Sequence, residues 1–131
     1  VDNNFSLNQI VVNSYDPNDI TCKFMKLENV FVKFTELINK LDNVRHIRMT
    51  SDDAIKPLLG SQVDFVYIDG LHTYDQVGKD IENYLQIIKP SGSIGGHDYH
   101  PVYQGVINAV NEKLGEPNKT FKDTSWIKKI K

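Results

Sequence analysis

Apolar side chains recur with helical spacing in three stretches of the chain. Within residues 26–42 they fall three or four positions apart, the pattern of a helix with one buried face. The same spacing follows Tyr74, and it recurs before Gly115, a residue type that commonly ends helices. A shorter helix is predicted after residues 51–53 (Ser-Asp-Asp), which can cap it, and it ends near Gly60. The sequence therefore predicts four helices.

Short runs rich in β-branched and aromatic residues predict strands around these helices. Four of them are residues 9–14, 44–49, 63–68 and 93–96. The third run is mostly apolar, as expected for a buried parallel strand. Residues 89–92 (KPSG) are expected to end the preceding helix. Two further runs, 119–122 and 126–130, flank an Asp-Thr-Ser turn and predict a hairpin.

The order of these elements predicts the fold class. Strands and helices alternate along the chain, which is typical of a mostly parallel sheet with right-handed crossovers and helices on both faces. We therefore expect a three-layer, Rossmann-like α/β fold with a C-terminal antiparallel hairpin. The length of 131 residues has room for one domain, residues 1–131.

Composition excludes several classes of protein. With 15 basic and 17 acidic side chains, the net charge is −2, and nucleic-acid binding is not expected. No apolar run approaches the length of about 18 residues that a membrane-spanning helix needs. The single cysteine, Cys22, excludes an internal disulfide and a multi-cysteine zinc site. We expect a cytoplasmic protein that binds no membrane.

Polar side chains follow each of the four predicted parallel strands, where ligands bind in open α/β sheets. They are Asp16 after the first strand, Ser51 and Asp52 after the second, Asp69 and His72 after the third, and His97 and Asp98 after the fourth. The Asp16 carboxylate could accept two hydrogen bonds from a ribose. Asp69 and Asp98 could supply oxygen ligands to one divalent cation. His72 or His97 could add a nitrogen ligand or act as a general base.

Four of these residues also have an ordinary structural interpretation. Asp69 and Asp98 could cap the helices that follow them. Asp16 precedes a proline and could be a turn residue. His72 could hydrogen-bond only to the backbone of its loop. Trp126 is interpreted as a packing residue, because an aromatic side chain in a short strand usually contributes to the core.

The central block of the chain resembles a known family. Residues 63–99 read VDFVYIDGLHTYDQVGKDIENYLQIIKPSGSIGGHDY. This block is similar to class I S-adenosylmethionine-dependent methyltransferases, in the branch of small-molecule O-methyltransferases with an I-D-G-x-H-x-Y element. The K-P-G-G-like turn and the acidic pair before Tyr99 also fit this branch, as does Trp126 in the tail. The resemblance implies methylation of a hydroxyl on a small molecule.

Site roles follow from the resemblance by position. Several family members bind a divalent metal such as Mg²⁺, which implies Asp69, His97 and Asp98 as ligands here, although His97 replaces the usual acidic residue. Catalytic roles fall to His72 and His97. The expected cofactor-binding residues for S-adenosylmethionine are Asp16 at the ribose, Ser51 and Asp52 near the adenine, and Asp69.

The mapping also predicts what this chain lacks. The first strand of the family and its glycine-rich cofactor loop have no counterpart, because no glycine precedes Gly60. We therefore expect an N-terminally truncated domain. Leu71 also replaces an acidic residue that often positions the substrate. An alternative is a non-catalytic, degenerate Rossmann-like fragment that binds no cofactor. Strand edges left without a partner predict a homo-oligomer in either case.

Overall fold

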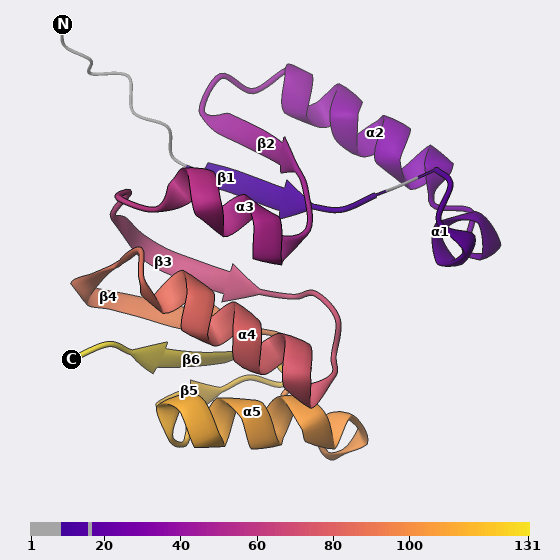
Figure 1. Cartoon of the computed structure of the whole chain (residues 1–131). Coiled ribbons are helices and arrows are strands. Elements are labelled where there is room, and N and C mark those ends of the chain that lie inside the picture. The colour runs from indigo at the N-terminus through magenta and orange to yellow at the C-terminus, as the bar shows by residue number, and fades with distance from the viewer. Residues whose placement is uncertain (1–8, 16) are drawn as a thin grey trace, which may run out of the picture. The chain divides into compact units, whose positions relative to one another are not determined.

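The computed structural model describes residues 9–15 and 17–131, so the predicted ribose ligand Asp16 lies outside the described residues. The chain separates into two compact units, Val1–Ala54 and Ile55–Lys131. Figure 1 shows the elements of both units along the chain. Each unit is described by itself below. The expectation of a single, N-terminally incomplete domain stays a prediction.

The first unit pairs two parallel strands and carries helices between them. Its elements are β1 (Gln9–Asn13), α1 (Ile20–Phe24), α2 (Glu28–Asn39) and β2 (Val44–Arg48). Both strands and α2 agree with the sequence-based prediction. Helix α1 was not predicted. Asp19 caps its N-terminus, and the Asp19 carboxylate accepts hydrogen bonds from the backbone N–H groups of Thr21 and Cys22.

Aromatic contacts hold α2 against β2. The rings of Tyr15 and Phe31 stack with their centroids 4.5 Å apart. The Arg48 guanidinium lies 5.5 Å and 4.9 Å from the centres of these two rings, which is within the range of a cation–π contact. His46 meets Phe34 edge-on at 4.9 Å. Neither α1 nor α2 contributes a buried residue, so α2 packs through these half-buried contacts.

Helix α3 (Ser51–Leu58) follows β2 directly. The Thr50 hydroxyl accepts a hydrogen bond from the backbone N–H of Asp53, with 3.2 Å between the atoms. The capping side chain is thus that of Thr50, one residue before the predicted capping segment 51–53. Ser51 and Asp52, the predicted adenine neighbours, form the first turn of α3.

The second unit contains a four-stranded sheet with the order β3-β4-β6-β5. Its elements are β3 (Val63–Ile68), α4 (Tyr74–Leu85), β4 (Ile88–Gly96), the short 3₁₀ helix η1 (Pro101–Tyr103), α5 (Gln104–Leu114), β5 (Lys119–Thr120) and β6 (Trp126–Lys129). Strands β3 and β4 are parallel, and β6 is antiparallel to both β4 and β5. The predicted C-terminal hairpin is confirmed.

Strand β4 begins earlier than predicted. Val63 pairs with Ile88, yet Phe65 pairs with Ser93, so β4 has extra residues between the two pairs. Residues 89–92 form this irregular segment within the strand instead of a turn before it. A residue without a Cβ is needed at position 92, because a Cβ there would lie only 2.7 Å from the backbone oxygen of Asp64 and would clash with it. Helix α4 already ends at Leu85.

One apolar cluster joins α4 and α5 to the sheet. Its buried members are Val77, Ile81, Ile88, Ile94, Val106, Ala109, Val110 and Trp126. Val66 and Ile68 of β3 pack against it, whereas the alternating residues Phe65 and Tyr67 remain 47% and 49% exposed. This alternation is that of a strand with one covered face. No described helix is long and apolar enough to cross a membrane. The cytoplasmic location stays a prediction.

Candidate active site

The loop that follows β3 carries two of the predicted site residues, Asp69 and His72. Gly70 lies over the buried carboxylate of Asp80, because a Cβ at Gly70 would be 3.7 Å from Asp80 Oδ2. Asp80 is 5% exposed and accepts a hydrogen bond from Gln76 Nε2 over 3.0 Å. Thr73 then begins α4, with its hydroxyl accepting from the Gln76 backbone N–H. The base of the loop is therefore fixed by α4.

The end of β4 brings His97 and Asp98 to the same edge of the sheet. The His97 backbone N–H donates to the Ile68 carbonyl over 3.1 Å, which extends the β3–β4 pairing to the last residue of β3. Asp98 then turns the chain with a φ of +64°, in the left-handed region. Aspartate is one of the few residues besides glycine that enter this region readily. The backbone thus places Asp98 across from the loop of Asp69 and His72.

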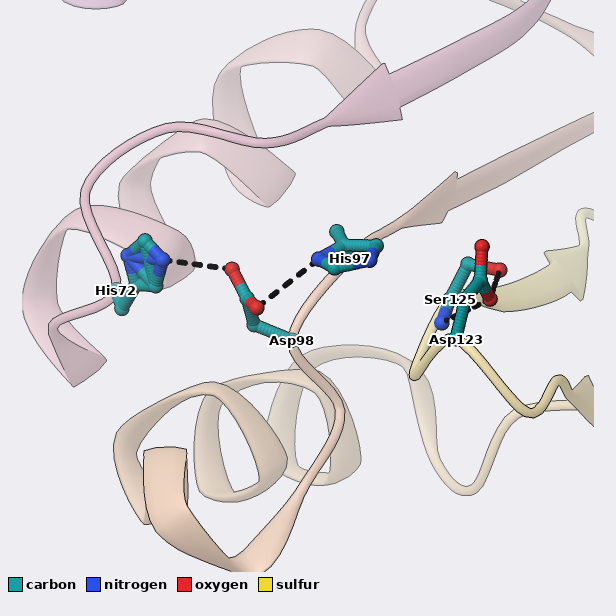
Figure 2. Close-up of polar contacts among 5 residues, drawn as sticks. All are labelled: His72, His97, Asp98, Asp123 and Ser125. Atoms are coloured by element: carbon teal, nitrogen blue, oxygen red, sulfur yellow. Dashed lines mark hydrogen bonds and ion pairs between the residues drawn. The ribbon is translucent and has the colours of Figure 1, made fainter.

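Asp98 lies between two imidazoles, as Figure 2 shows. Its Oδ2 is 2.6 Å from His72 Nε2, and its Oδ1 is 2.9 Å from His97 Nδ1. The Asp98 side chain is 15% exposed, while those of His72 and His97 are 39% and 32% exposed. The hydrogen bond with Asp98 raises the pKa of His97 above its usual value, against the opposing effect of burial. A carboxylate held between two imidazoles can orient both rings and stabilise the charged form of either.

Asp69, His97 and Asp98 have the geometry of a possible metal site. Each offers one ligand atom, and these atoms all lie within 4.8 Å of one another. Two carboxylates with one imidazole suit a divalent ion that accepts both oxygen and nitrogen ligands, such as Mn²⁺, better than they suit Mg²⁺. An ion bound by His97 Nδ1 and Asp98 Oδ1 would replace the hydrogen bond between these two atoms, and Asp98 Oδ2 would keep its contact with His72. The donor set therefore fits a metal in type and spacing.

The turn of the hairpin adds negative charge beside this cluster. Asp123 accepts hydrogen bonds from the backbone N–H and the hydroxyl of Ser125, over 3.0 Å and 2.6 Å (Figure 2). These hydrogen bonds lower the pKa of Asp123. Burial, and then three neighbouring carboxylates, raise the pKa of the Tyr67 hydroxyl. The carboxylates are Asp69, Asp123 and Asp98.

A small pocket opens at this edge of the sheet, and its polar lining includes Asp69, His72, His97 and Asp98. Apolar side chains of α4 and α5 complete it, together with the Trp126 indole. The sequence interpretation gave Trp126 only a packing role. Outside this lining, the Tyr103 ring packs against His72 with 4.6 Å between centroids. No pattern in the sequence distinguishes Tyr103 from other exposed aromatic residues.

The structure brings together four of the predicted site residues. Asp69, His72, His97 and Asp98 all belong to the second unit and line the same pocket. The predicted adenine neighbours Ser51 and Asp52 belong to the first unit. The role of each residue stays a prediction at this point.

Comparison with known proteins identifies the kind of domain. Residues 13–99, more than half of the chain, match the family model of a methyltransferase domain. Among solved structures, a provisionally assigned type 11 methyltransferase from Sulfolobus solfataricus matches with a TM-score of 0.52 and 17% sequence identity, over 93% of this chain and 85% of that chain. This likeness supports the Rossmann-like fold. A comparison with curated proteins gave no significant match.

Proposed function

Because the chain belongs to the methyltransferase domain family, we propose that it transfers a methyl group from S-adenosylmethionine to a hydroxyl group of a small molecule. The observation that supports this reaction best is Asp98 between His72 and His97, next to Asp69, at the carboxyl ends of parallel strands. Methylation of a hydroxyl requires an oxygen that is oriented and can lose its proton. An imidazole backed by a carboxylate meets the second requirement.

The residues of the second unit have separate tasks in this proposal. His97 or His72 accepts the proton of the acceptor hydroxyl. Asp98 holds the imidazole in place and stabilises the positive charge that develops on it. When bound, S-adenosylmethionine supplies an electrophilic methyl group, and its transfer leaves S-adenosylhomocysteine.

The proposed cofactor-binding residues follow from their positions in the chain. Ser51 and Asp52 follow β2 and are the proposed adenine neighbours, while Asp16 is the proposed ribose ligand. Asp69 follows β3 and is the proposed contact nearest the reacting groups. In the sequence, each lies in the segment that follows a predicted parallel strand, the usual location of ligand-binding side chains in such sheets.

We propose that a divalent cation assists the reaction. Asp69, His97 and Asp98 would hold it, because their ligand atoms lie within 4.8 Å of one another. When bound there, the ion would lower the pKa of the acceptor hydroxyl. His72 is not part of this donor set, so it remains the base in the metal-loaded protein.

The test is transfer of a labelled methyl group from S-adenosylmethionine to a panel of catechols, phenols and sugars. Asp98→Asn should lower the transfer rate by at least about a hundredfold, because the imidazoles lose their charged partner. Asp64→Asn is the matched control, since its side chain is 87% exposed and its carboxylate pairs with Lys89, away from the residues that line the pocket. Absence of transfer to every acceptor, together with no binding of the cofactor, would instead support the non-catalytic alternative.

A further inference from the structure

The indole N–H of Trp126 is a buried donor without an acceptor. Trp126 is 2% exposed, and its Nε1 has no hydrogen-bond partner among the residues that the structure describes. An indole N–H can only donate a hydrogen bond. Buried polar groups of this kind are nearly always satisfied, and an orphan calls for an explanation, such as a ligand or an ordered water.

The position of this N–H is fixed by the glycines opposite. Trp126 pairs with Gly96 across the β4–β6 ladder. A Cβ at Gly96 would lie 2.9 Å from Trp126 Nε1, and one at Gly95 would lie 2.6 Å from the Trp126 carbonyl oxygen. Any larger residue at these positions would therefore displace the tryptophan. The glycine pair lets the ring lie against the end of β4, directly before His97.

The pocket that Trp126 lines contains a specific combination of polar groups. Its other polar side chains are two carboxylates and two imidazoles, at Asp69, Asp98, His72 and His97. A group placed among them must accept from the indole and also donate to a carboxylate or a neutral imidazole. A hydroxyl does both, whereas an ether or a carbonyl has no proton to donate and an ammonium has no lone pair. Of these four groups, the lining therefore favours a hydroxyl.

We propose that Trp126 Nε1–H donates a hydrogen bond to the acceptor hydroxyl and is a positioning residue for the methyl acceptor. The inference rests on the proposed function, because it takes the occupant of the pocket to be the group that is methylated. The hydroxyl accepts from Trp126 and donates its proton toward an imidazole, which leaves a second lone pair for the new bond to carbon. The methyl ether that the reaction produces can still accept from Trp126, but it has no proton to donate to the carboxylates or imidazoles, so the lining as a whole discriminates between the two.

The single tryptophan of the chain makes a direct test possible, because a ¹⁵N-labelled sample gives one indole N–H resonance. The full chain is titrated with methanol and with phenol as hydroxyl probes. Anisole is the matched control for phenol, since its methyl ether has no proton to donate. We expect a saturable downfield shift of the resonance with both hydroxyl probes and not with anisole. An unmoved resonance, as expected if only water occupies the pocket, or an equal shift with anisole, would overturn the proposal.

A second variant separates this proposal from the proposed function. Benzothienylalanine in place of Trp126 keeps the shape of the ring and removes the N–H, whereas Trp126→Phe leaves a space in the core. We expect the analogue to raise the KM of the hydroxyl acceptor about tenfold, the effect of one lost hydrogen bond, with unchanged binding of S-adenosylhomocysteine. An unchanged KM would contradict the role of Trp126. A wild-type chain that transfers no methyl group would contradict the proposed function, and the indole resonance would still report on the pocket.

Discussion

His72 and Asp98 connect the two strand ends of the site, with 2.6 Å between His72 Nε2 and Asp98 Oδ2. His72 belongs to the loop after β3, and Asp98 follows β4. The second oxygen of the same carboxylate lies 2.9 Å from His97 Nδ1. Asp98 is therefore the common partner of both candidate bases, and the left-handed backbone at this residue, with φ at +64°, supports that position.

The first prediction is that His72 and Asp98 act as a unit. His72→Gln and Asp98→Asn should each lower the rate of methyl transfer. The double variant should be little slower than the more impaired single variant, because residues that share one function give non-additive effects. The measurement is the initial rate for all four proteins of the cycle. Rate effects that multiply in the double variant would show that the two side chains act independently.

The second prediction concerns the metal. Mn²⁺ titrated into the chain should bind at one site, and Asp69→Asn should weaken the binding at least about tenfold, because a charged oxygen ligand is lost. Calorimetry or the electron paramagnetic resonance signal of free Mn²⁺ measures this. Asp75→Asn is a suitable control, since Asp75 lies outside the cluster, in the first turn of α4. Equal affinity in the wild type and in Asp69→Asn would rule out this donor set.

The third prediction is a dependence of stability on pH through Asp123. Hydrogen bonds from Ser125 lower the pKa of Asp123 in the folded chain from its ordinary value of 3.8. Its contribution to stability is therefore present above the unfolded pKa and is lost as the pH falls through the folded pKa. The free energy of unfolding in urea should differ between the wild type and Asp123→Asn near neutral pH, and the difference should shrink in acid.

Ser125→Ala provides the control for this effect. It removes the hydroxyl donor at 2.6 Å and keeps the backbone donor at 3.0 Å. Its loss of stability should therefore be smaller than that of Asp123→Asn at neutral pH. A difference between wild type and Asp123→Asn that is the same at all pH values would contradict the role of the ionised carboxylate.

The fourth prediction is self-association. Strand β3 is at the edge of the described four-stranded sheet, and its residues Phe65 and Tyr67 are about half exposed. Exposed strand edges and apolar faces favour pairing with another chain. Sedimentation across a dilution series should show a dimer that dissociates, and Tyr67→Lys should lower its stability. A monomer throughout the micromolar range would contradict this expectation.

The sequence predicts which polar residues of the second unit lie together better than it predicts some of the elements. Asp69, His72, His97 and Asp98 could be found because parallel strands end at one edge of a sheet and each strand is followed by polar residues. Helix α1 has only five residues and was too short for a periodic pattern. Residues 89–92 suggested a turn because proline and glycine are common in turns, yet these residues form an irregularity inside β4.

Trp126 illustrates what a sequence pattern does not contain. A tryptophan in a strand predicts packing, and the packing prediction is correct, since the residue is 2% exposed. Its possible role in recognition depends on whether the buried N–H has an acceptor. That property is decided by the tertiary structure around Gly96, so it can only be seen once the strands are paired.

The central claim is tested most directly by calorimetric titration of the chain with S-adenosylhomocysteine, with and without Mn²⁺. A methyltransferase domain should bind this product saturably, with a dissociation constant in the micromolar range. Asp69→Asn should weaken the binding, and Asp64→Asn should leave it unchanged. Absence of binding heat in both buffers would contradict the proposed function and favour a domain that keeps the fold without the cofactor.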